Sequence, residues 1–144
     1  MILLDTSFLV DALAGSTKNS AFALRQAFEL GELIRVPALV FYEWLRGPRL
    51  REEMAAMEAL FPAVGAIVFG HEEATISARL YRSVPRPRGR EMDLAIAACA
   101  LARDAHLWTL NPADFKEIPG IRLYPPSRRH KNSTDSYAGM RCPA

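Results

Sequence analysis

Four acidic residues stand where a parallel α/β sheet would bring them together. Asp5 directly follows a short apolar run, and Asp114 lies in a turn just after another. Glu43 lies on the helical segment after Pro37, and Asp93 begins an alanine-rich helical segment. Ligands of open parallel sheets bind outside the carboxyl ends of the strands. We therefore expect these four side chains to line one site.

Such a group of carboxylates predicts a particular chemistry. Converging carboxylates repel one another, and without a cation at least one of them is driven to take up a proton. A hard divalent ion relieves this repulsion, and Mg²⁺ or Mn²⁺ prefers oxygen ligands. A bound metal lowers the pKa of a water and stabilises the leaving oxygen. The pattern points to phosphodiester hydrolysis, with one or two metals left open.

Each acid also has a simpler structural interpretation when it is taken alone. Asp5 would cap a helix, and Glu43 would be a solvated helix position. Asp93 would follow the preference for negative charge at a helix N-terminus, although its apolar neighbours predict burial in the core. Asp114 would form an Asx turn. Only the conjunction of the four supports a site.

The elements that must position these acids alternate between short apolar runs and helical periods. Strands are predicted over residues 2–4, 34–36, 66–69, 106–110 and 121–124. Helices are predicted over residues 5–15, 18–30, 37–47, 49–60, 71–83, 91–104 and 112–115. This alternation favours a parallel sheet covered by helices.

The composition predicts one cytoplasmic domain. The chain has 144 residues, of which 50% are hydrophobic and 24% charged, which is ordinary for a globular protein. Its two cysteines predict neither a disulfide framework nor a zinc site, and so favour a reducing compartment. No apolar run approaches the ~20 residues of a membrane span, and the first residues do not read as a signal peptide.

The net charge of +2 is unevenly distributed. Residues 127–144 carry most of the basic excess and little apolar content, whereas residues 1–126 are slightly acidic. We interpret residues 1–126 as the folded domain and residues 127–144 as a basic, disordered tail.

Four short segments stand in a fixed order along the chain. They are Ile2-Leu3-Leu4-Asp5-Thr6-Ser7, Glu43-Trp44-Leu45-Arg46-Gly47, Asp93-Leu94-Ala95-Ile96-Ala97-Ala98 and Thr109-Leu110-Asn111-Pro112-Ala113-Asp114-Phe115. With this order and spacing, over about residues 1–124, the chain resembles PIN-domain proteins and, among them, the VapC toxins of type II toxin–antitoxin pairs. The segment Val40-Phe41-Tyr42 and the C-terminal tail depart from that pattern.

The resemblance implies a PIN-like three-layer α/β/α fold with a short parallel sheet, and a Mg²⁺-dependent endoribonuclease, with Mn²⁺ as a possible substitute. It further implies a homodimer and a small VapB-like antitoxin that blocks the acidic cleft. It assigns catalysis and metal binding to Asp5, Glu43, Asp93 and Asp114. The supporting positions are Thr6 or Ser7, which follow the first acid, and Thr109 and Asn111, which support the fourth.

Arginines flank two of the acids. Arg46 follows Glu43, and Arg86, Arg88 and Arg90 precede Asp93. We hypothesise that these arginines hold the RNA backbone, because arginine contacts to phosphate position nucleic acid without reading its sequence. A solubilising surface, or a surface that docks the antitoxin, is the alternative.

Three other functions stay open for the chain. One is a PIN-like RNA-processing nuclease without an antitoxin, which small size without an appended domain disfavours. Another is a catalytically silent PIN-like RNA-binding module, although all four acids are present. The third is a small phosphotransferase or signalling receiver, which would need a lysine at the end of a late strand. The lysines of the chain are Lys18, Lys116 and Lys131.

Overall fold

The computed structural model describes residues 1–15 and 19–125. Its strands are β1 (Ile2–Leu4), β2 (Ile34–Arg35), β3 (His106–Trp108) and β4 (Arg122–Tyr124). Its helices are α1 (Thr6–Leu13), α2 (Asn19–Glu29), α3 (Ala38–Leu45), α4 (Arg51–Leu60), α5 (His71–Ser83), α6 (Glu91–Ala102) and α7 (Pro112–Phe115), with a 3-10 turn η1 (Ala63–Gly65). Within the described ranges, no helix has the length and apolar content needed to span a membrane.

The strands form one parallel sheet in the order β2-β1-β3-β4. Ile2 is paired with Ile34 on one side and with His106 on the other, and His106 is paired with Arg122. The chain therefore leaves β1 toward β2 and later returns on the other side of β1 to form β3. A parallel sheet binds ligands at the point where its strand order reverses, which here is the gap between the carboxyl ends of β1 and β3.

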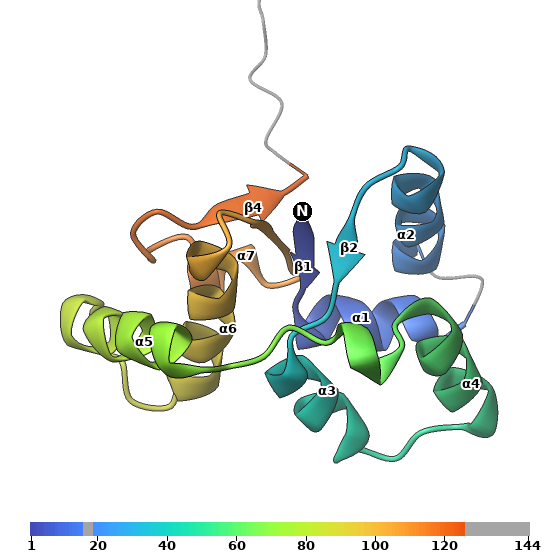
Figure 1. Ribbon diagram of the computed structural model, residues 1–144, viewed down its shortest axis with the longest axis horizontal. Coiled ribbons are helices and arrows are strands. Elements are labelled where there is room, and N and C mark those ends of the chain that lie inside the picture. The colour runs from blue at the N-terminus through green and yellow to red at the C-terminus, as the bar shows by residue number, and fades with distance from the viewer. Residues whose placement is uncertain (16–18, 126–144) are drawn as a thin grey trace, which may run out of the picture.

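Helices cover both faces of the sheet, which confirms the predicted three-layer α/β/α fold. Figure 1 shows α1 to α4 on one side of the central strands, and α5 and α6 on the other. The strand β1 is completely buried, as expected for a strand with helices on both faces. Residues 94–100 of α6 are also buried. The small side chains among them, four alanines and Cys99, let α5 pack closely against this helix.

The strand predicted over residues 66–69 is wrong. This segment makes only an isolated parallel bridge, between Ile67 and Pro37. Two hydrogen bonds hold it, from the Ile67 N–H to Val36 O and from the Ala38 N–H to Ile67 O. The pairing ends there because α3 begins at Ala38 and turns the partner chain away. The apolar side chains of Ile67 and Phe69 instead pack against the core.

Other boundaries differ by a few residues. The strand predicted over 106–110 ends at Trp108, because Thr109 and Leu110 turn toward the end of β1. The prediction missed the 3-10 turn Ala63–Gly65. The predicted tail over residues 127–144, and the first residue of the helix predicted over 18–30, lie outside the described residues.

Candidate active site

Asp5 lies at the reversal point of the sheet. It directly follows β1, its side chain is buried, with the residue only 5% exposed, and its N–H donates to Trp108 O at 2.9 Å. It occupies the N-cap position of α1, but its side chain makes no capping hydrogen bond. The simple capping interpretation therefore does not explain this residue, whose carboxylate is engaged elsewhere.

Two hydroxyl groups hold the Asp5 carboxylate. Ser7 Oγ donates to Asp5 Oδ2 at 2.8 Å, and Thr109 Oγ1 donates to the same oxygen at 2.7 Å. Each hydroxyl oxygen in turn accepts a backbone N–H, from Leu110 at 3.1 Å and from Asn111 at 3.0 Å. These N–H donors leave each hydroxyl proton directed at Asp5. Within the described chain, Asp5 Oδ1 accepts no hydrogen bond, so one carboxylate oxygen is held by two hydroxyls and the other has no hydrogen-bond donor.

The supporting hydroxyl residues contact different acids from those that the prediction assigned to them. Thr109, which was expected to support Asp114, contacts Asp5 instead. The sequence left open whether Thr6 or Ser7 assists the first acid, and the structure uses both hydroxyls for different acids: Ser7 bonds Asp5, while Thr6 bonds Glu43.

Glu43 is tied to the start of α1. The Thr6 hydroxyl donates to Glu43 Oε2 in a short hydrogen bond, and Arg46 Nη2 lies 3.6 Å from Glu43 Oε1. The Arg46 side chain is 60% exposed, and its guanidinium also lies over the Tyr42 ring. An ion pair this exposed contributes little stability, so the Thr6 hydroxyl is the contact that fixes the Glu43 carboxylate.

The structure brings the four acidic charges together at Asp93. Asp93 lies in the first turn of α6 and is half-buried, rather than in the core as expected. Burial raises the pKa of its carboxyl from the ordinary 3.8 to about 6, with further increases from the charges of Asp5, Asp114 and Glu43. Arg90 acts in the opposite direction. This is the mutual repulsion that the sequence predicted for converging carboxylates.

Asp114 forms the open side of this acidic group. It is exposed on the short helix α7, and its N–H donates to Asn111 O at 3.1 Å. Asn111 occupies the N-cap position of α7, without a side-chain capping bond. Its contribution to the site is therefore the backbone N–H that it gives to Thr109.

The acidic residues fit a hard divalent cation by their chemistry. In residues 1–15 and 19–125, no three His, Cys, Asp or Glu side chains are grouped closely enough to form a metal cage. Mg²⁺ does not require such a cage, since it keeps several waters and binds through one or two carboxylates. The free Oδ1 of Asp5 and the charge concentrated around Asp93 are features that such an ion would stabilise.

The arginines predicted to hold RNA fall into two groups. Arg86 and Arg88 are exposed on the loop before α6. Arg90 is instead partly buried against the protein surface, where it donates to the backbone carbonyls of Pro85 and Asp114. Arg86 and Arg90 line a polar cavity of about 540 Å³ together with Asp114 and Glu117.

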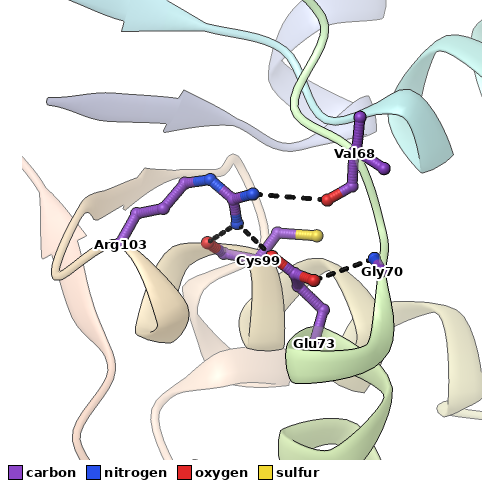
Figure 2. Close-up of polar contacts among 5 residues, drawn as sticks. All are labelled: Val68, Gly70, Glu73, Cys99 and Arg103. Atoms are coloured by element: carbon purple, nitrogen blue, oxygen red, sulfur yellow. Dashed lines mark hydrogen bonds and ion pairs between the residues drawn. The ribbon is translucent and has the colours of Figure 1, made fainter.

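A partly buried ion pair between α5 and the C-terminal end of α6 was missed by the sequence reasoning (Figure 2). Arg103 Nη1 lies 2.6 Å from Glu73 Oε1 and also donates to Cys99 O, while the Gly70 N–H donates to Glu73 Oε2 at 2.8 Å. Burial alone would raise the pKa of Glu73, but these hydrogen bonds and the Arg103 charge hold it below its ordinary value. The pair joins two helices of the scaffold rather than the acidic site, and no residue spacing marks it in the sequence.

Comparison with known proteins agrees with this architecture. A family model described as PIN domain matches residues 2–121. The chain is 38% identical over 125 residues to "Ribonuclease VapC19" of Mycobacterium tuberculosis, covering 85% of this chain and 98% of that protein.

A DNA-bound VapBC structure from Salmonella typhimurium is similar with a TM-score of 0.67 and 20% identity, over 85% of this chain and 95% of that one. A toxin–antitoxin complex from Klebsiella pneumoniae is similar with a TM-score of 0.65 and 24% identity, over 84% and 95% of the two chains. The family match and the M. tuberculosis relative establish that the chain belongs to the PIN-domain family, in its VapC ribonuclease branch.

Proposed function

We propose that this chain is a metal-dependent endoribonuclease that acts as the toxin of a toxin–antitoxin pair. The observation that carries the proposal is the concentration of acidic charge on Asp93, to which Asp5, Glu43 and Asp114 all contribute. This charge lies at the reversal point of a parallel sheet, where ligands of such sheets bind. The identity to a ribonuclease over most of the chain supports RNA as the substrate.

Asp5 and Asp93 are the residues that would hold Mg²⁺ or Mn²⁺, with Glu43 and Asp114 completing the acidic surface around it. When bound, the ion supplies an activated water and stabilises the leaving oxygen of the phosphodiester. The hydroxyls of Ser7 and Thr109 donate hydrogen bonds to one oxygen of Asp5 and so fix the orientation of its carboxylate. The four acids also repel RNA phosphates, so a bound cation that offsets their charge is expected to strengthen RNA binding.

The RNA backbone would be held by the exposed arginines next to the site. Arg86 and Arg88 lie on the loop that leads into α6, and Arg46 is exposed beside Glu43. Their substitution by glutamine is expected to weaken RNA binding for all sequences alike, since phosphate contacts carry no base information.

An antitoxin is the proposed protein partner. Structures of VapBC complexes are among the similar folds, and α1, α2 and α4 surround an apolar hollow of about 340 Å³. Phe28 and Leu60 on its rim are each more than a third exposed, which suits an apolar side chain of a small VapB-like protein. We further propose a homodimer and a cytoplasmic location, the latter because the cysteine usage suits a reducing compartment.

The test is cleavage of RNA by the purified protein, with Mg²⁺ or Mn²⁺ and with EDTA. Asp5→Asn and Asp93→Asn are expected to lower activity by at least about 100-fold. Asp104→Asn is the matched control, because Asp104 is exposed before β3, at the opposite edge of the sheet. Full cleavage in EDTA, or in the Asp5→Asn Asp93→Asn double variant, would disprove the metal mechanism.

The toxin role has its own test. A neighbouring reading frame for a small DNA-binding protein, whose product forms a complex with this chain and suppresses cleavage, is the expected result. Cleavage that no neighbouring product inhibits would favour an RNA-processing nuclease instead.

A further inference from the structure

Arg90 differs from the other arginines near the site in how its side chain is used. Its guanidinium Nη2 donates to Asp114 O at 2.5 Å, and its Nη1 donates to Pro85 O at 3.3 Å. Nη1 also lies 3.7 Å from Glu117 Oε2, with the Arg90 side chain only 20% exposed. One planar group thus contacts three separate points of the chain.

The backbone of Arg90 connects the same side chain to the start of α6. Arg90 is the N-cap residue of that helix, and its carbonyl accepts the Leu94 N–H at 2.9 Å. Its own N–H donates to Pro87 O at 3.0 Å, which fixes the end of the preceding loop. Arg90 therefore joins the helix that carries Asp93 to the turn that carries Asp114.

The turn that carries Asp114 is anchored in the core by the buried side chains of Phe115 and Ile118, whereas Asp114 itself is exposed. The helix α7 has only four residues, and Phe115 is its buried member. A helix this short is not stable by itself, because most of its backbone groups lack partners within the helix. The contacts from Arg90 to Asp114 O and Glu117 hold both sides of Phe115, at the exposed end of the site.

We propose that Arg90 is a positioning residue that holds the Asp114 turn against the start of α6, and that it is not a ligand of the RNA backbone. This inference rests on the proposed function and assigns a different role to one of its arginines. Two of the Arg90 nitrogens already have acceptors within the protein, and its side chain is only 20% exposed, so the guanidinium is fixed in place and largely covered. Lysine cannot take over this role, because a point charge does not reproduce the planar fork of donors.

The experiment compares Arg90→Gln and Arg90→Lys with Arg88→Gln, a matched control on the exposed part of the same loop. Three quantities are measured for each full-length protein: Mn²⁺ affinity by electron paramagnetic resonance, the salt dependence of RNA binding in EDTA, and backbone hydrogen exchange of residues 111–118. Steady-state cleavage separates kcat from KM.

Both Arg90 variants are expected to weaken Mn²⁺ binding and lower kcat by about 10-fold or more, the usual cost of losing a residue that orients a metal ligand. KM for RNA, and the slope of RNA affinity against salt concentration, should stay within about twofold of the wild type. Backbone hydrogen exchange should become faster in residues 111–118 but not in α5. Arg88→Gln should do the reverse, reducing the salt slope by about 0.7 for one phosphate contact on a single strand.

Two results would overturn the positioning role. One is an Arg90→Gln protein with a reduced salt slope and unchanged Mn²⁺ affinity. The other is an Arg90→Lys protein with wild-type Mn²⁺ affinity and wild-type exchange, which decides the matter even if Arg90→Gln does not fold. If the wild type neither binds Mn²⁺ nor cleaves RNA, the proposed function fails, while the exchange of residues 111–118 still tests the contact itself.

Discussion

The crowding of negative charge around Asp93 predicts that, in the metal-free protein, the contribution of this residue to stability falls as the pH rises. The pKa of Asp93 is raised from 3.8 to about 6 by burial and by Asp5, Asp114 and Glu43. The folded state therefore retains this proton to a higher pH than the unfolded chain does. Its stabilising contribution is complete below pH 4 and is lost as the pH rises through 6.

The size of the effect follows from that difference in pKa. At about 1.4 kcal/mol for each pKa unit, the difference between 3.8 and 6 corresponds to about 3 kcal/mol. Because Asp93 is half-buried and partly screened by water, we expect about 2 kcal/mol of this to be realised. Asp93→Asn removes the charge, so the variant should gain about 2 kcal/mol relative to the wild type between pH 4 and pH 7.5.

Urea unfolding in EDTA measures this quantity directly. The difference in unfolding free energy between Asp93→Asn and the wild type is followed from pH 4 to pH 7.5, with Glu58→Gln as a control on exposed α4. Glu58→Gln gives the baseline for removing one exposed carboxylate. A difference for Asp93→Asn that changes with pH no more than this baseline would refute the charge repulsion inferred from the structure.

Addition of Mg²⁺ extends the same experiment to the cation. A ligand that binds the folded state at 100 times its Kd adds about 2.7 kcal/mol of stability. At pH 7.5 the wild type should gain stability in Mg²⁺, and Asp93→Asn should gain much less. Equal gains in both proteins would mean that the ion binds elsewhere.

Three further substitutions test the contacts around the site and in the scaffold. Thr109→Val removes one of the two hydroxyls on Asp5 and should lower cleavage by about 10- to 100-fold, measured with RNA at fixed Mg²⁺. Thr6→Val frees the carboxylate on α3 and should lower cleavage by a similar or smaller factor, with the fold preserved by circular dichroism. Arg103→Met leaves the buried Glu73 carboxylate without its ion-pair partner and should lower the free energy of unfolding in urea by about 3 kcal/mol. A decrease of less than about 1 kcal/mol would show that the pair does not hold α5 to α6.

The sheet could be predicted from the sequence where burial on both faces leaves a continuous apolar run. The residues before Asp5 form such a run, and they became the central strand β1. The same reasoning failed over residues 66–69, because an apolar run records burial and not hydrogen bonding. Residues 66–69 lie beside Pro37, which is the N-cap of α3. Because the chain turns into that helix, the segment forms only one bridge, between Ile67 and Pro37.

The four acids could be selected by type and position, but their supports could not. Ser7 and Thr109 are 102 residues apart in the sequence, and only the parallel pairing of β1 with β3 brings both to one oxygen of Asp5. The resemblance to PIN-domain proteins assigned Thr109 to the nearby Asp114 instead. The Glu73–Arg103 pair could not be predicted either. Its two residues are 30 positions apart in the sequence, and a charged residue at a helix end usually faces solvent.

The site therefore has a fixed side and an adjustable side. Asp5 is buried at the end of β1, beside β3, and its supporting hydroxyls are held by backbone N–H groups. Asp114 is exposed on a four-residue helix, on the side away from the buried Phe115, so its own side chain has no core packing to resist movement. Substitutions around Asp5 should alter stability and cleavage together, because the same contacts serve the sheet and the carboxylate. Substitutions that loosen Asp114 should alter cleavage and metal affinity while global stability is nearly unchanged, so the sequence can vary cation affinity at this turn without disturbing the sheet.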